Sequence, residues 1–219
     1  MIRGLIELSL NRDQFAVVLA SLRARYRNGE WVDGEPLTVG DLATGYGVSA
    51  TPVREALSRL AGDGLVEDRR GRGYYARRID GIDLADLLRV QETLALAALA
   101  AVRLGRQQRL LAPSSAGYLD DPVQAWEALF DVVMRNASSG FLISIQQRLS
   151  DRLAPARRVE AEVLGETPGD FEPLILAQSS PEWTGLECAL GPFFQRRRLA
   201  VEDLVVRMRL NASKYKDSI

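Results

Sequence analysis

Three short helical patterns followed directly by two β-prone segments occupy the first 80 residues, and this order constrains the fold more than any other feature. Helices are predicted from about residue 11 to 27, from 38 to about 46 and from 49 to 62, and β segments over 65–68 and 74–77. Glycines separate the segments, and Thr38 and Ser49 are predicted to cap the second and third helices. Three helices and a hairpin in so short a stretch predict one compact domain over residues 12–78.

The third predicted helix has an apolar face and a polar face. Its apolar stripe consists of Val53, Ala56, Leu57 and Leu60, and its opposite face of Thr51, Arg54 and Ser58. Such a helix is typical of a winged helix-turn-helix, whose third helix enters the DNA major groove. Ser49 and Thr51 would then reach phosphates or base edges, and Arg54 would form paired hydrogen bonds with guanine. Arg59 would contact the DNA backbone. For Arg54 taken alone, a solvated surface arginine is an equally good interpretation.

The predicted hairpin concentrates positive charge at its tip. Arg69, Arg70 and Arg72 stand among Gly71 and Gly73, and Arg77 and Arg78 follow at the base, against only Glu67 and Asp68. The net charge of the whole chain is −1, so the hairpin is a local basic site within a nearly neutral protein. The stretch Gly71–Ala76 formally resembles a dinucleotide-binding fingerprint, but tyrosines rather than a helix follow its glycines, which excludes that interpretation.

The remainder of the chain, residues 82–219, predicts a second domain made only of helices. Helical patterns cover about 83–105, 122–137, 140–153, 181–198 and 200–212. The stretch from Leu94 to Val102 is apolar on all sides, which predicts a helix buried on several sides. The expected fold is therefore mainly α, with a winged helix-turn-helix followed by a helical bundle for dimerisation and effector binding.

The composition argues against catalysis, metal binding and membrane insertion. The chain has no histidine and one cysteine, Cys188, so the commonest general base and the usual nitrogen ligands of transition metals are missing. We expect no enzyme activity, no cofactor and no metal. A lone thiol fits a reducing cytoplasm, no signal peptide is evident, and the longest apolar run is far shorter than the ~20 residues of a membrane helix. A cytoplasmic protein without membrane partners is expected.

The N-terminal sequence resembles the GntR family of bacterial regulators. The resemblance rests on GEPLT at Gly34–Thr38, DLA at Asp41–Ala43, GVS at Gly47–Ser49, TPVREALSRL at Thr51–Leu60, and the GLV and GRG stretches at Gly64–Val66 and Gly71–Gly73. It implies that Thr51, Arg54 and the wing tip touch DNA and that Leu57 and Leu60 are core. Members often carry arginine where this chain has Gly40 and Ala50, so the resemblance implies an atypical operator, or an affinity that depends more on the wing and on dimerisation.

The helical domain is similar in length and pattern to the effector domains of the FadR-like subgroup. That similarity places Glu127, Asp131, Glu187 and Arg209 where metal-binding members have their ligands, and Gln91 where acid-binding members use arginine. Two interpretations of the residues at the metal-ligand positions stay open. In the first, the three carboxylates and Arg209 form an arginine–carboxylate cluster that fills the pocket. In the second, Glu127 and Asp131 simply line a solvated helix face.

These observations predict a homodimeric transcription regulator, a repressor that binds operator DNA and responds to a small-molecule effector. The predicted DNA-binding residues are Thr38, Ser49, Thr51, Arg54, Arg59, Arg69, Arg70, Gly71, Arg72 and Gly73, and the predicted effector residues are Gln91, Glu127, Asp131, Glu187 and Arg209. A dimer is expected because one recognition helix contacts too few base pairs for useful selectivity. The alternative is a protein-interaction module that kept the winged fold and lost DNA binding.

Overall fold

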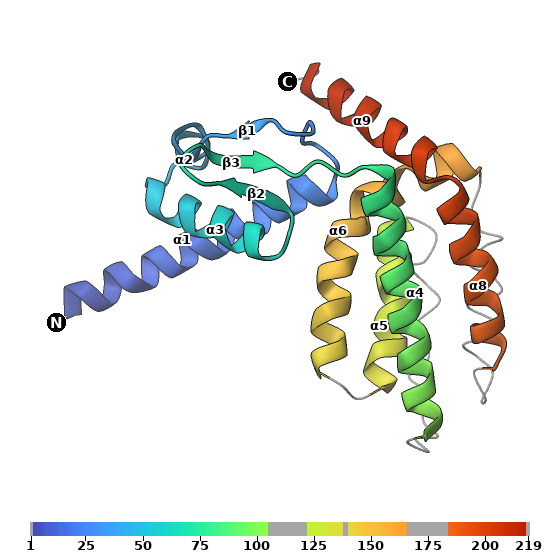
Figure 1. Cartoon of the computed structure of the whole chain (residues 1–219). Helices are drawn as coiled ribbons and strands as arrows, with labels where there is room; N and C mark the ends of the chain where they lie inside the picture. The colour runs from blue at the N-terminus through green and yellow to red at the C-terminus, as the bar shows by residue number, and fades with distance from the viewer. Residues whose placement is uncertain (1, 105–121, 138–139, 166–183, 218–219) are drawn as a thin grey trace. The chain divides into compact units, whose positions relative to one another are not determined.

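The computed structural model describes residues 2–104, 122–137, 140–165 and 184–217, which form two compact units (Figure 1). The N-terminal unit consists of Met1–Ile79 together with Arg209–Ile219, and the helical unit consists of Asp80–Met208. The last residues of the chain thus group with the first 79, whereas the sequence pattern had placed them with residues 82–208. The two-domain boundaries inferred from the sequence stay a prediction.

The N-terminal unit contains three helices and a small sheet. Its elements are α1 (Ile2–Arg27), β1 (Pro36–Leu37), α2 (Val39–Tyr46), α3 (Ala50–Gly62), β2 (Val66–Arg69) and β3 (Gly73–Ala76), followed much later by the end of α9. The strands are antiparallel in the order β1-β3-β2, with Glu67 opposite Tyr75 and Asp68 opposite Tyr74. The predicted mainly α architecture with a winged helix-turn-helix is confirmed. Strand β1 was not predicted, because two residues are too few to show an alternating pattern.

The apolar stripe predicted for α3 forms the centre of this unit. Val53, Ala56, Leu57 and Leu60 are all fully buried, as is Leu22 of α1. The capping prediction was wrong in its chemistry. Thr38 and Ser49 do occupy the positions before α2 and α3, but neither side chain makes a capping hydrogen bond. Both hydroxyl-bearing residues are exposed, so their side chains are available to other partners.

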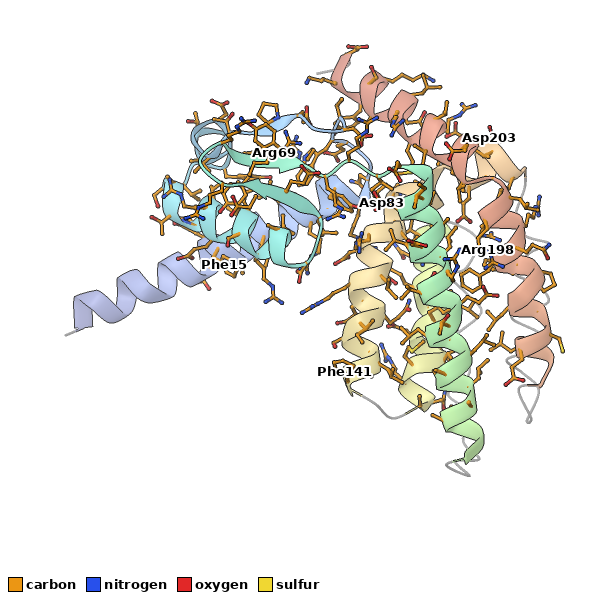
Figure 2. All side chains as sticks on the ribbon, in the orientation of Figure 1. Phe15, Arg69, Asp83, Phe141, Arg198 and Asp203 are labelled. Carbon is orange, nitrogen blue, oxygen red and sulfur yellow. The ribbon has the colours of Figure 1, made fainter. Side chains whose placement is uncertain are left out.

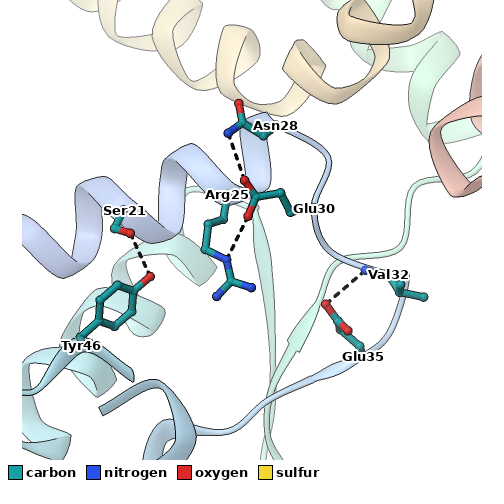
Figure 3. A network of polar contacts seen from close by, with 7 residues as sticks. All are labelled: Ser21, Arg25, Asn28, Glu30, Val32, Glu35 and Tyr46. Carbon is teal, nitrogen blue, oxygen red and sulfur yellow. Dashed lines mark hydrogen bonds and ion pairs between the residues drawn. The ribbon is translucent and has the colours of Figure 1, made fainter. Parts of the chain in front are cut away.

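Polar contacts fix α1 to the segments that surround it (Figure 3). Ser21 and Tyr46 share a hydrogen bond of 3.0 Å between their hydroxyls, which ties α1 to α2. Arg25 and Asn28 both donate to the carboxylate of Glu30, at 3.1 Å each. These contacts, together with the edge-on packing of Tyr26 and Trp31 at 5.9 Å between ring centroids, hold the turn that leads from α1 into the sheet.

The helical unit packs its helices around α4. Its elements are α4 (Gly81–Leu104), α5 (Pro122–Asn136), α6 (Gly140–Leu164), α8 (Thr184–Leu199) and the first part of α9 (Val201–Asp217). Helix α4 contacts α5, α6 and α8. The helix expected over 140–153 was predicted too short, because α6 continues through the buried Pro155 to Leu164. Residues 181–183, where the next helix was expected to begin, lie outside the described residues.

Candidate DNA-binding surface

The polar face of α3 is presented to solvent. Ser49, Thr51 and Arg54 are all exposed, and among the described residues Arg54 takes part in no ion pair. Because Val53 and Leu57 on the opposite face are fully buried, the helix is rotated so that its polar face cannot turn inward. The guanidinium of Arg54 is therefore free to form the paired hydrogen bonds that arginine makes with guanine.

Arg59 is less available than the sequence suggested. Its Nε lies 3.5 Å from a carboxylate oxygen of Asp63, which also accepts a hydrogen bond of 2.9 Å from Arg23. Asp63 is buried with only 8% of its surface exposed, so this carboxylate orients both arginines at the C-terminal end of α3. The Arg59 side chain is still 58% exposed, and it stays predicted to contact the DNA backbone.

The wing tip is a tight turn built on glycine. Gly71 and Gly73 have φ angles of 74° and 96°, values that residues with a Cβ rarely adopt. The backbone amide of Arg72 donates to the carbonyl of Arg69 at 2.7 Å, which closes the turn. As a result Arg70 and Arg72 project from the tip, both exposed and, within the described part of the chain, without an ion-pair partner.

Arg69, labelled in Figure 2, behaves differently from its two neighbours. Its Nε and Nη2 donate to one carboxylate oxygen of Glu67 at 3.0 and 2.8 Å, and its guanidinium lies 4.2 Å from the ring centroid of Tyr75. Tyr75 faces Glu67 across the hairpin, so the three side chains form one cluster on the sheet. Sequence reasoning missed Tyr75, whose signal would have been its register opposite Glu67. The unpaired charge of the tip rests on Arg70 and Arg72.

Of the predicted effector residues, Arg209 lies in the N-terminal unit and the other four lie in the helical unit. Gln91 is buried on α4 and accepts a hydrogen bond of 3.0 Å from Arg157. Asp131 pairs with Arg135 one turn later on α5, at 3.1 Å, while Glu127 and Glu187 are half-buried on α5 and α8. Arg209 belongs to the N-terminal unit and bonds Asp33 there. Within the described ranges no group of three or more histidine, cysteine, aspartate or glutamate residues could hold a metal ion.

A set of buried polar side chains that includes Gln91 lies inside the helical unit, and it is called the buried polar cluster below. Glu160 and Arg197 form an ion pair at 2.9 Å with side chains 5% and 1% exposed, and the guanidinium of Arg197 lies 3.5 Å from the ring centroid of Phe193. Arg157 and Gln91 form a second pair, and Gln146 donates to Ser150 at 3.0 Å. Sequence reasoning singled out Gln91 but missed the other members, because the charges at 157–160 look like an ordinary solvated helix face.

Two buried amide atoms of this cluster have no hydrogen-bond partner among the described residues. They are Nε2 of Gln91 and Oε1 of Gln146, and both residues are 1% exposed. A buried amide group that lacks a partner costs about 1–3 kcal/mol. The helical unit therefore contains one buried amide donor and one buried amide acceptor that lack a protein partner among the described residues.

No helix within the described residues is both long and apolar enough to cross a membrane.

Comparisons with known proteins address the N-terminal segment most directly. The sequence model of bacterial regulatory proteins of the gntR family matches residues 16–75.

Two curated proteins are similar to part of the chain. An HTH-type transcriptional regulator in an unstable DNA locus of Streptomyces ambofaciens is 35% identical over 85 residues, which cover 39% of this chain and 36% of that protein. The HTH-type transcriptional regulator BphR of Paraburkholderia xenovorans is 35% identical over 86 residues, which cover 39% of this chain and 31% of that protein. The matched segment thus spans about a third of each relative.

Solved structures extend the likeness of fold to most of the chain. McbR/YncC of E. coli has a TM-score of 0.64 at 22% identity, and the match covers 87% of this chain and 97% of that one. A GntR transcriptional regulator from Rhodococcus sp. RHA1 has a TM-score of 0.57 at 18% identity, covering 90% and 97%. At such identities the likeness concerns the fold alone. Residues 16–75 are therefore similar in sequence to bacterial regulatory proteins of the gntR family, and they fold as a winged helix-turn-helix.

Proposed function

We propose that this protein is a homodimeric regulator that binds operator DNA through α3 and the wing. The observation that carries the proposal concerns two exposed surfaces. The apolar stripe of α3 is buried while Arg54 on its other face is exposed, and the wing tip exposes Arg70 and Arg72. Two kinds of contact follow: α3 reads base edges in the major groove, and the tip meets phosphates or the minor groove. Repression is the simplest consequence, because a protein seated on its operator blocks other proteins from that DNA.

The second copy is proposed to pack on α4. Although α4 contacts three helices, Val90, Thr93, Leu96, Ala97, Ala100 and Ala101 remain exposed on one face without a charge among them. Small residues such as these let two helices approach closely. Asp86 and Arg89 precede this face, paired with each other at 3.0 Å and both more than 60% exposed. An acid and a base on one face can pair equally well with a second copy across a two-fold axis.

The helical unit is proposed to act as a FadR-like effector domain for a small molecule. Support comes from the unpartnered amide atoms of Gln91 and Gln146, which would hydrogen-bond a polar ligand. Gln91, Glu127, Asp131 and Glu187 stay predicted effector residues, whereas Arg209 bonds Asp33 in the N-terminal unit. The test is a ligand screen for release from the operator, repeated with Gln146→Leu. A releasing compound that acts equally on the variant would contradict this site.

The test of DNA binding is a selection from a random DNA pool followed by titration of the enriched site at several salt concentrations. We expect two chains per site, as sedimentation of the complex would measure, and an affinity that falls steeply between about 50 and 200 mM salt, because Lys and Arg displace counterions from phosphates. If no site is enriched and random DNA shows no salt-dependent binding, the result would favour a protein-interaction module. An operator-binding role implies location in the cytoplasm, where the DNA is.

A further inference from the structure

The C-terminal end of α9 carries two cations that bind the base of the wing. Nε of Arg209 donates to Asp33 at 2.9 Å, and Nη2 of the same guanidinium donates to the carbonyl of Ile79 at 3.2 Å. Two turns further along the helix, Nζ of Lys216 bonds Glu35 at 3.0 Å. All five residues belong to the N-terminal unit.

These contacts form one helix face. Ala212 lies three residues after Arg209 and four before Lys216, and it is buried with 5% of its surface exposed. Residues three and four apart on a helix are neighbours on its surface. The polar contacts of Arg209 and Lys216 therefore lie on one face of α9, with the buried Ala212 between them.

The acceptors of Arg209 lie on the two chain segments that frame the sheet. Asp33 precedes β1, and Ile79 follows β3. The same two segments already exchange backbone hydrogen bonds, from Gly34 to the carbonyl of Ala76 at 3.0 Å and from Ala76 to the carbonyl of Glu35 at 2.9 Å. One guanidinium thus bridges the segment that enters β1 and the segment that leaves β3.

Glu35 extends this arrangement. While one of its carboxylate oxygens accepts from Lys216, the other accepts from the backbone amide of Val32 at 3.2 Å, a contact drawn in Figure 3. Lys216 therefore orients a side chain that shapes the turn before β1. Among the described strands, β1 pairs with β3, so this turn is linked through β1 to β3, the strand that carries one side of the wing.

On the strength of the DNA-binding function proposed above, we propose that Arg209 is a positioning residue for the wing. It touches no DNA; it fixes the base of the β2–β3 hairpin so that Arg70 and Arg72 reach the duplex together with α3. Lys216 acts in the same way through Glu35, to a smaller extent, because its side chain is 62% exposed. Arginine is preferred at 209 because its rigid planar group places two different nitrogens, Nε and Nη2, against the two acceptors, whereas lysine has a single nitrogen on a flexible chain.

The experiment compares Arg209→Ala and Arg209→Lys with the wild type and with Arg207→Ala. Arg207 is the matched control, since it lies on the same helix, makes a similar exposed ion pair at 3.0 Å to Glu162, and belongs to the helical unit. Binding to the selected DNA site is expected to weaken about threefold to tenfold in both Arg209 variants, a range typical of losing one oriented contact. Arg207→Ala should bind as the wild type does.

A second background separates positioning from simple destabilisation. In a protein whose Arg70 and Arg72 are already alanine, Arg209→Ala should have almost no further effect, because the element it positions no longer contacts DNA. An equal loss of affinity in both backgrounds, or wild-type affinity of Arg209→Ala, would overturn the proposal.

Amide hydrogen exchange makes the test independent of DNA. Arg209→Ala should accelerate exchange at Gly34 and Ala76, whose backbone hydrogen bonds join the two bridged segments, and leave exchange within α3 unchanged. Unaltered exchange at both amides would refute the bridging role even if the wild type bound no DNA. Failure of DNA binding by the wild type, with accelerated exchange in the variant, would instead reject the proposed function alone.

Discussion

Replacement of Glu160 by glutamine is expected to lower the free energy of unfolding by about 3–5 kcal/mol, the usual cost of removing one partner of a buried ion pair. Arg197 is fully buried, and its guanidinium cannot reach water when the carboxylate is gone. The measurement is urea unfolding, with the slope of each transition checked, because two units need not unfold together.

Glu162→Gln is the matched control for this variant. Glu162 lies on the same helix two residues later, and its partner is Arg207, with the two side chains 45% and 38% exposed. An exposed pair contributes only about 0–1 kcal/mol, because solvent screens it. Similar stability losses in the two variants would mean that the Glu160–Arg197 pair is not the buried interaction described here.

Leu57→Ala is expected to cost about 2–5 kcal/mol of stability, because it leaves a cavity that the surrounding side chains fill only in part. Leu57 has no exposed surface, and its helix α3 contacts both α1 and β2. Ser58→Ala is the control, since Ser58 is the next residue and faces solvent, and exposed substitutions of this kind usually change stability by less than about 0.5 kcal/mol. Equal melting temperatures of Leu57→Ala and the wild type would contradict the assigned core.

The winged helix could be predicted because its signals are local. The α3 stripe follows from residues three and four apart, and the wing follows from glycines and arginines within one hairpin. By contrast, Arg157 and Gln91 are 66 residues apart and Arg209 and Asp33 are 176 apart. Nothing in a single sequence pairs such residues, so the buried cluster and the role of Arg209 needed the structure.

Helix α4 shows a second limit of sequence reasoning. The run from Leu94 to Val102 predicted a helix buried on several sides, and Ala95, Ala98, Leu99 and Val102 are indeed buried. A helix surface that binds a second copy, as proposed for α4, would have the same composition as one that faces a core, because the centre of an interface is also depleted of charge. Periodicity therefore could not show that Leu96 and its neighbours would stay exposed.

The measurement that tests the central claim most directly compares Arg54→Ala with the Arg69, Arg70 and Arg72 to alanine variant, each on the selected site and on random DNA at several salt concentrations. Arg54→Ala should mainly reduce the ratio of specific to random affinity. The free-energy difference between the two kinds of binding should shrink by about 1–3 kcal/mol, the contribution of one base contact.

The wing variant should weaken binding to both DNAs almost equally. The slope of log affinity against log salt concentration should decrease in magnitude by about 0.9 for each phosphate contact removed. We expect the loss of two such contacts, those of Arg70 and Arg72, because Arg69 is already paired with Glu67. That division of labour is the predicted result. A wing variant that lost discrimination while keeping the full salt slope, beside an Arg54 variant that kept its specificity, would contradict this account of how the protein binds DNA.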